Sequence, residues 1–250
     1  MSRPLQRSRA AETASPPLVS TLDQADWAAI QCALDAQGYA TTTALLTHDE
    51  CRELVALYNE DARFRSRVVM QRHAFGRGEY KYLNYPLPPV IEALRQSIYP
   101  RLAPIANRWR QALGEPGVFP PALDAFLAEC HAAGQPRPTP LLLRYGPDDY
   151  NCLHQDLYGP LAFPLQLTVL LSEPGRDFTG GEFVLVEQRP RAQSKAEVVP
   201  LAPGEAVIFT VNHRPARGTR GWYRVALRHG VSRVRSGSRH TLGVIFHDAA

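Results

Sequence analysis

The tripeptide His154-Gln155-Asp156 is the only H-x-D sequence in the chain. It places an imidazole and a carboxylate two residues apart, and both are common ligands of transition metals. On its own the triplet is a weak signal. Its position strengthens it, because it follows a predicted strand and turn and precedes further predicted strands. The triplet therefore predicts two ligands of a metal site at the opening of a β-barrel.

A third ligand has to come from a later strand. Two histidines and one carboxylate leave three positions open on a metal, which suits non-haem Fe(II) binding a cosubstrate and O₂ together. A structural zinc site would be closed by four ligands. The candidates are His213, His229, His240 and His247. We select His229, because it lies inside a predicted strand, and a strand can direct a side chain rigidly into a barrel.

Arg239 opens the last predicted strand, ten residues after His229. A buried arginine without a partner is costly, so an arginine entering an apolar strand implies an anionic partner. Its planar guanidinium binds carboxylates in a bidentate manner better than lysine does. We therefore predict that Arg239 binds the distal carboxylate of a dicarboxylic cosubstrate.

The elements that position these residues begin near Pro138. From there short β-type runs alternate with Gly- and Pro-rich turns, which predicts a small all-β barrel or jelly roll. The predicted strands cover residues 139–145, 164–171, 181–187, 196–201, 205–210, 224–231 and 240–246.

The first half of the chain predicts helices. One is expected from Thr21 or Asp23 up to Gly38, and a second begins at Thr47, where Glu50 completes a capping-box spacing. A third is expected over residues 88–113.

Pro100 and Pro104 are expected to break or kink the third helix. Between the second and third helices, residues 67–88 mix glycine, aromatic and basic residues, and they predict a loop or short hairpin of the kind that often contacts ligands.

These patterns divide the chain into three regions. Residues 1–20 are expected to form a disordered tail, residues 21–135 a helical region, and residues 136–250 the barrel. The N-terminal helices are expected to pack on the barrel, which gives an α+β fold.

Charge is unevenly distributed. The net charge is +4, and only 2 of the 28 cationic residues are lysines. Between Glu205 and Asp248 no acidic residue occurs, which favours an anionic partner such as nucleic acid. The same stretch holds eight arginines: Arg214, Arg217, Arg220, Arg224, Arg228, Arg233, Arg235 and Arg239.

The location of the protein is expected to be cytoplasmic. No run of 18 apolar residues predicts a membrane span, and the basic start has no apolar segment typical of a secretion signal. The four cysteines follow neither a zinc pattern nor a disulfide framework, which fits free thiols in a reducing compartment.

With these residues in view, residues 138–248 resemble the Fe(II)- and 2-oxoglutarate-dependent oxygenase superfamily. The matching features are His154-Gln155-Asp156, the T-G-G-E-F segment at 179–183, the G-E-A-V-I-F segment at 204–209, His229 and Arg239. The Y-G-P-D-D-Y run at 145–150 is similar to prolyl 4-hydroxylase-like members. The whole chain resembles a bacterial group of these oxygenases thought to act on nucleic acids.

The resemblance implies a double-stranded β-helix that binds Fe(II), 2-oxoglutarate and O₂. It also implies that Tyr145 and Thr168 contact the cosubstrate. The reaction implied is oxidative decarboxylation of 2-oxoglutarate to succinate and CO₂, coupled to hydroxylation of a substrate C–H bond.

Three functions remain open. The first is oxidative dealkylation of nucleic-acid bases, with a single-stranded or flipped base contacted by Arg72, His73, Lys81 and Tyr82. The second is hydroxylation of a protein side chain such as proline. The third is a cupin-like barrel that binds a metal or ligand without turnover.

Overall fold

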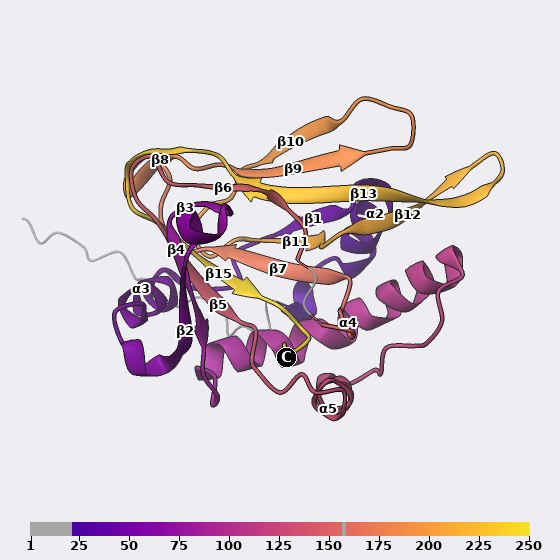
Figure 1. Ribbon diagram of the computed structural model, residues 1–250, viewed down its shortest axis with the longest axis horizontal. Coiled ribbons are helices and arrows are strands. Elements are labelled where there is room, and N and C mark those ends of the chain that lie inside the picture. Colours follow the sequence, from indigo (N-terminus) through magenta and orange to yellow (C-terminus); the bar gives the residue numbers. More distant parts are fainter. Residues whose placement is uncertain (1–21, 157–158) are drawn as a thin grey trace, which may run out of the picture.

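The computed structural model describes residues 22–156 and 159–250, so the predicted tail at 1–20 lies outside the described residues. Two antiparallel sheets lie one above the other, and helices α4 (Pro89–Leu113) and α5 (Leu123–Ala132) cover the outer side of the larger sheet (Figure 1). This arrangement leaves the space between the sheets for a barrel interior, and it supports the predicted jelly-roll type of fold.

The larger sheet has seven strands. In spatial order they are β1 (Tyr39–Thr42), β11 (Ala206–Thr210), β7 (Leu165–Leu170), β15 (Arg239–Val244), β5 (Leu141–Tyr145), β4 (Glu79–Leu83) and β2 (Phe64–Val69).

The second sheet has six strands. Five follow the order β10 (Lys195–Val199), β9 (Phe183–Gln188), β13 (Gly221–Val231), β6 (Tyr150–His154) and β3 (Gly76–Arg77), and β12 (His213–Gly218) also pairs with β13. A separate pair consists of β8 (Phe178–Gly180) and β14 (Val234–Gly237).

All seven predicted strands are present, as β5, β7, β9, β10, β11, β13 and β15. The predicted loop or hairpin at 67–88 contains β3 and β4, and β4 pairs with β2 on one side and with β5 on the other. The larger sheet therefore contains strands from both sides of residue 135. Strand β3 has only two residues and pairs with β6, so tertiary pairing rather than the local sequence reveals it as a strand.

Side-chain caps mark the start of the next two helices. Asp26, and not the predicted Asp23, caps α2 (Trp27–Gln37), and the other predicted cap, Thr21, lies outside the described residues. Gly38 ends the helix with a φ of 81°, a conformation that glycine adopts without strain. Helix α3 (His48–Leu57) begins with the predicted capping box between Thr47 and Glu50. Two short 3₁₀ turns follow, η1 (Asp61–Arg63) and η2 (Met70–His73).

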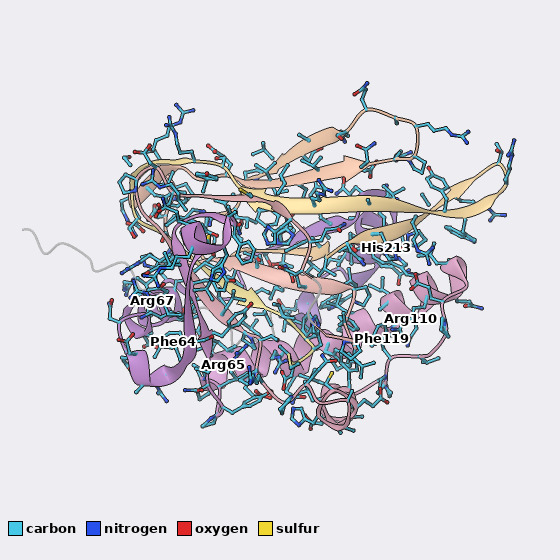
Figure 2. All side chains as sticks on the ribbon, in the orientation of Figure 1. Phe64, Arg65, Arg67, Arg110, Phe119 and His213 are labelled. Carbon is cyan, nitrogen blue, oxygen red and sulfur yellow. The ribbon has the colours of Figure 1, made fainter. Side chains whose placement is uncertain are left out.

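Pro100 and Pro104 were expected to break or kink helix α4, and they do not break it. Pro100 and Pro104 lie inside one continuous helix. Its apolar side is buried, and that packing offsets the hydrogen bonds that proline cannot make. At its C-terminal end the Arg110 guanidinium lies 3.7 Å from the centre of the Phe119 ring, close to His213 of β12 (Figure 2). No described helix combines the length and apolarity needed to cross a membrane.

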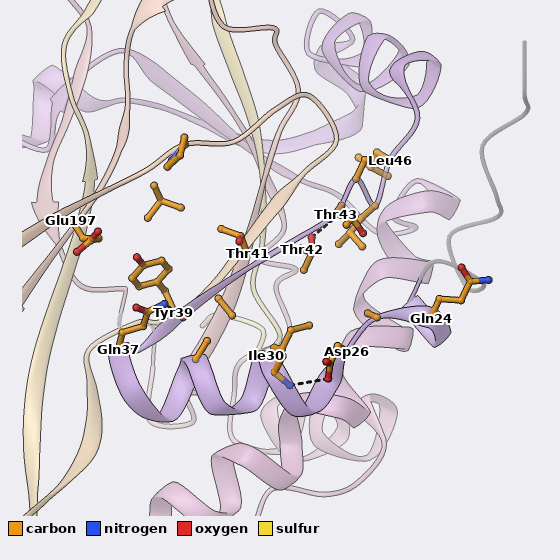
Figure 3. Close-up of a pocket in the computed structure, with 18 of the residues that line it drawn as sticks. Gln24, Asp26, Ile30, Gln37, Tyr39, Thr41, Thr42, Thr43, Leu46 and Glu197 are labelled. Atoms are coloured by element: carbon orange, nitrogen blue, oxygen red, sulfur yellow. Dashed lines mark hydrogen bonds between the residues drawn. The ribbon is translucent and has the colours of Figure 1, made fainter.

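A broad surface groove of about 1030 Å³ lies between α2, β1 and β10 (Figure 3). Its labelled polar residues include Thr41, Thr42 and Tyr39, and the carboxylates of Asp26 and Glu197 lie far apart along it. Among the residues the structure describes, the groove contains no cluster of metal-binding side chains.

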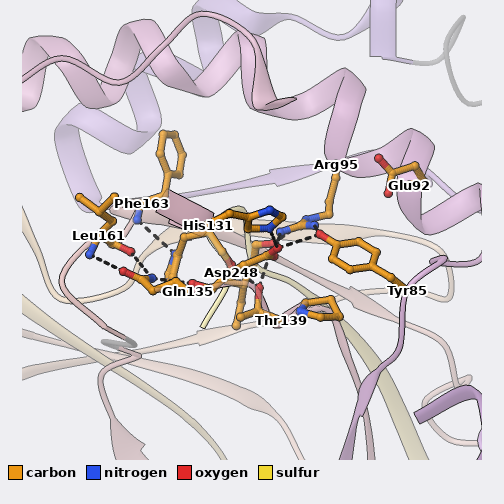
Figure 4. A network of polar contacts seen from close by, with 12 residues as sticks. Tyr85, Glu92, Arg95, His131, Gln135, Thr139, Leu161, Phe163 and Asp248 are labelled. Carbon is orange, nitrogen blue, oxygen red and sulfur yellow. Dashed lines mark hydrogen bonds and ion pairs between the residues drawn. The ribbon is translucent and has the colours of Figure 1, made fainter. Parts of the chain in front are cut away.

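A buried ion pair ties the C-terminal segment to helix α4. Arg95 Nη2 lies 2.9 Å from Asp248 Oδ1, and both side chains are fully buried (Figure 4). The Tyr85 hydroxyl donates to Asp248 Oδ2 at 2.9 Å, and His131 Nε2 lies at the same distance from that oxygen. The network satisfies both carboxylate oxygens, which burial of a charge requires.

Candidate metal centre

Three potential metal ligands meet between the sheets. His154 ends β6, and the pairing of β6 with β13 places it directly opposite His229. His154 Nε2 lies 3.3 Å from Asp156 Oδ1, and His229 Nε2 lies 3.3 Å from Asp156 Oδ2. One ligand atom from each residue lies within 4.8 Å of the other two. The three side chains can hold one metal ion, and no other such group exists in the described part of the chain.

The electrostatics of this group suit a cation. Burial alone would raise the pKa of Asp156, but the adjacent His229 and His154 lower that pKa well below its usual value. Burial lowers the pKa of His229, which favours the neutral imidazole that binds metal. His154 Nδ1 lies 2.8 Å from the Cys152 carbonyl oxygen, so its Nε2 faces Asp156.

The other candidate histidines lie elsewhere. His213 begins strand β12, and its Nε2 lies 3.2 Å from Glu115 Oε1. His247 is buried, and its Nδ1 accepts a hydrogen bond from the Phe163 amide. His240 lies on β15 beside the ring of Tyr58. Of the four, His229 is the one that the tertiary structure brings to His154 and Asp156.

A cavity of about 330 Å³ opens onto the three residues. Arg239 lines it and is 2% exposed, and its Nε and Nη1 have no partner among the described residues. Burial lowers the pKa of Arg239 to about 10. An unpaired buried guanidinium is costly, and these two nitrogens are available to an anion in the cavity.

Tyr145 and Thr168, both predicted cosubstrate contacts, line the same cavity. Tyr145 pairs in register with Arg239 across β5 and β15, and the guanidinium lies 5.6 Å from the centre of its ring. Burial raises the pKa of Tyr145 to about 12, so its hydroxyl stays protonated and can donate a hydrogen bond. The cavity thus combines a cation with neutral donors, which fits a carboxylate.

Several residues of the cavity were not predicted. Gln166 is 5% exposed and donates from Nε2 to Asp156 Oδ2 at 2.8 Å. It lies two residues before Thr168 on β7, so both point to the same side of the strand. For Gln166 and Thr168 alike, the feature visible in the sequence is a polar residue within an otherwise apolar strand. Asn151 lines the cavity too, with Nδ2 3.5 Å from the Tyr145 hydroxyl.

Of the four predicted substrate contacts, two are exposed and two are buried. Arg72 and His73 are exposed in η2, and the His73 ring stacks on Phe75, which lines the cavity. Lys81 is buried, and its ammonium donates to the Tyr58 carbonyl at 2.8 Å and to Asp61 at 2.7 Å.

Tyr82 is 8% exposed and packs with Leu141 and Ile245. Strand β4 is an interior strand, so its side chains are needed for packing. The structure therefore brings neither Lys81 nor Tyr82 to the cavity, which is lined instead by Tyr80 of the same strand.

One known protein family matches most of the chain. Residues 78–249 match the family Oxygenase-NA, described as an oxygenase catalysing oxidative methylation of damaged DNA. Two proteins of Mycobacterium tuberculosis, uncharacterized protein Rv2227 of strain H37Rv and uncharacterized protein MT2286 of strain CDC 1551, are each 55% identical over 165 residues. The matched region is 66% of this chain and 71% of theirs.

Solved structures are similar in fold. A prolyl-4-hydroxylase of Pseudomonas putida has a TM-score of 0.51 at 14% identity, covering 87% of this chain and 96% of that one. The non-heme alpha-ketoglutarate-dependent epimerase SnoN of nogalamycin biosynthesis has a TM-score of 0.52 at 15% identity, covering 87% and 80%. The predicted resemblance is confirmed at the level of the family: the chain belongs to the Oxygenase-NA family, and its fold is similar to those of these two solved enzymes.

Proposed function

We propose that this protein removes alkyl groups from nucleic-acid bases by oxidation, at a metal held by His154, Asp156 and His229. We also propose that the two facing sheets form a double-stranded β-helix. The observation that carries the proposal is the meeting of these three ligands with the unpaired buried Arg239 in one cavity. This is the pair of sites that Fe(II) and a dicarboxylic cosubstrate require together.

Each residue has a defined task. Bound Fe(II) supplies the activation of O₂ by which 2-oxoglutarate yields succinate and CO₂ while a substrate C–H bond is hydroxylated. Arg239 neutralises the far carboxylate of 2-oxoglutarate, with Tyr145 and Thr168 as hydrogen-bonding partners. The apolar lining excludes bulk water. An N-methyl group hydroxylated here becomes an N-hydroxymethyl group, which releases formaldehyde and leaves the bare amine.

The rim of the cavity favours a planar substrate. Phe75 is 49% exposed and Leu153 is 45% exposed, although both line the cavity. The backbone of Phe75 is held on both sides, because its N–H donates to the Met70 carbonyl and its carbonyl accepts from Cys152 N–H at 2.9 Å. A rigid, exposed aromatic ring stacks well on an unpaired base. The family description, which names damaged DNA, supports the same class of substrate.

The test is succinate formation from 2-oxoglutarate with added Fe(II) and O₂. The assay is run with an N-methylated single-stranded oligonucleotide, with the unmethylated oligonucleotide and without either, and formaldehyde is measured in parallel. Asp156→Ala serves as the blank, since it removes one metal ligand.

We expect both succinate and formaldehyde to increase when the methylated oligonucleotide is present. Neither product should increase with the unmethylated oligonucleotide or without any oligonucleotide. Succinate formed at one slow rate in all wild-type samples, and lost in the variant, would contradict the nucleic-acid substrate. It would direct the search to peptides. Succinate equal to the blank throughout would contradict the oxygenase site itself.

A further inference from the structure

Strand β13 carries different side chains on its two faces. Because side chains alternate along a strand, the inner face holds Tyr223, Val225, Leu227 and the metal-site residue His229. The opposite face holds Trp222, Arg224, Ala226 and Arg228. Trp222, Arg224 and Arg228 are all exposed. One strand therefore positions a metal-site residue inside the barrel and an aromatic and basic strip outside it.

Two hairpins extend this strip. Residues 219–220 connect β12 to β13, and residues 189–194 connect β9 to β10. Since β9 pairs with β13, the hairpins lie side by side, and Figure 1 shows both projecting beyond the barrel in the same direction. Their tips carry Arg191, Arg217 and Arg220. We call these three residues, together with Trp222 and Arg228, the β13 arm.

The arginines of the arm lack a carboxylate partner in the part of the chain that the structure describes. Within the described residues Arg191, Arg217, Arg220 and Arg228 form no ion pair, whereas the neighbouring Arg189 and Arg224 pair with Glu187 and Glu115. Trp222 is 51% exposed, and the Arg217 guanidinium lies 5.9 Å from the centre of its ring. Four exposed guanidinium groups without an ion-pair partner among the described residues give this surface a positive potential, which favours an anionic ligand.

The geometry fits an extended polyanion. Arg228 lies six positions after Trp222, which at ~3.3 Å per residue corresponds to roughly 20 Å. A nucleic-acid duplex presents a phosphate about every 3.4 Å along each strand. Arg228 lies next to His229 in the chain and points to the other side of the sheet, so the strip ends beside the metal centre.

We propose that the β13 arm binds the phosphate backbone of nucleic acid flanking the nucleotide under repair, with Trp222 stacking on a neighbouring base. This inference rests on the proposed function, because it assigns a partner to the same site. Arginine contacts with phosphates position the strand and carry no sequence information. The arm would therefore increase affinity for long substrates without affecting reaction of a short one.

The test compares two triple variants of the full chain. Arg217→Ser/Arg220→Ser/Arg228→Ser removes three arm charges, and Arg52→Ser/Arg101→Ser/Arg108→Ser removes three exposed charges from the helical side. Binding of a fluorescent 20-nucleotide single strand and its duplex is measured by anisotropy between 50 and 200 mM salt. Turnover is measured with the same oligonucleotide in methylated form and with a methylated dinucleotide.

We expect the arm variant to lose at least tenfold in affinity at 50 mM salt. Its slope of log K against log salt should fall by about 2, since each single-strand phosphate contact contributes about 0.7. The helical-side variant should bind like the wild type, and dinucleotide turnover should be equal in all three proteins. Trp222→Ala should weaken single-strand binding more than duplex binding.

Equal binding by all three proteins, or equal loss in both triple variants, would overturn the assignment of the arm. Because binding is measured without turnover, this result is separate from a failure of the proposed dealkylation. If nucleic-acid binding depends on the β13 arm but oligonucleotides do not stimulate succinate formation, the binding role of the arm is supported. The proposed dealkylation reaction is then contradicted.

Discussion

The side-chain amide of Gln166 donates a hydrogen bond to Asp156 Oδ2 at 2.8 Å, and both residues are buried. The same nitrogen lies 3.5 Å from His229 Nε2, so Gln166 contacts two of the three proposed metal ligands. A hydrogen bond to one carboxylate oxygen fixes the rotation of the carboxylate. Gln166 thereby sets the geometry of the ligand group without being a ligand itself.

We predict that Gln166→Leu weakens metal binding by about tenfold, since loss of an outer hydrogen bond to a ligand typically costs 10- to 100-fold in affinity. The measurement is titration of the metal-free protein with Mn(II), with free Mn(II) followed by electron paramagnetic resonance. Thr168→Val is the control, because it removes a polar side chain from the same face of β7 and touches no ligand in the contacts described. Equal dissociation constants for the two variants would contradict the role of Gln166.

Arg239 is predicted to strengthen binding of 2-oxoglutarate and to lower the stability of the cosubstrate-free protein. Arg239→Met should raise the KM for 2-oxoglutarate by roughly 10- to 100-fold, since a charged hydrogen bond contributes about 1.5–3 kcal/mol. It should also stabilise the cosubstrate-free protein by about 1–3 kcal/mol, because it removes a buried unpaired charge. Kinetics and urea unfolding check the two effects. The exposed Arg235, changed to Met as a control, should alter neither quantity.

Phe75 is predicted to contribute to binding of the nucleic acid and not to binding of 2-oxoglutarate. Phe75→Ala should raise the KM for a methylated oligonucleotide by about 5- to 100-fold, the range expected from a stacking contribution of about 1–3 kcal/mol. The KM for 2-oxoglutarate should stay unchanged. Phe75→Leu retains apolar area without a ring, so an oligonucleotide KM as low as that of the wild type would show that stacking is not the interaction.

The buried pair of Arg95 and Asp248 is predicted to dominate the attachment of the C-terminal segment. Asp248→Ala leaves a fully buried arginine without its carboxylate, and it should lower the free energy of unfolding by about 3–5 kcal/mol. Asp23→Ala breaks the exposed pair with Arg101 and should cost less than about 1 kcal/mol. Urea denaturation of both variants gives the comparison, and similar losses would be incompatible with this account.

Burial of His247 predicts an acid-sensitive fold. Burial lowers the pKa of His247 to about 4 from the usual 6.5. The folded protein keeps this side chain neutral, so its contribution is fully present above pH 6.5 and is lost as the pH falls towards 4. The loss is about 3 kcal/mol at most. In metal-free protein, His247→Asn should flatten the fall in unfolding free energy between pH 7.5 and 4.5, and an unchanged slope would rule this contribution out.

The sequence by itself determined the chemistry and the main strands. His154, Asp156 and Arg239 stood out because charged and metal-binding residues beside apolar strands need partners, and that requirement is local. The seven predicted strands follow from short apolar runs between turn residues. His229 was selected among four histidines because it lies inside a predicted strand, and the fold places it beside His154 and Asp156. Its role as a ligand stays a prediction.

Only the tertiary structure decided which neighbours share the cavity. The β4 segment looked like a ligand-contacting loop, but pairing with β2 and β5 buries Lys81 against Asp61 and Tyr58. Gln166 was apparent only as a polar residue in an apolar strand until the fold placed it against Asp156, ten residues away. Local patterns reveal which side chains need partners. Which partner each receives depends on strand register, and long-range pairing sets that register.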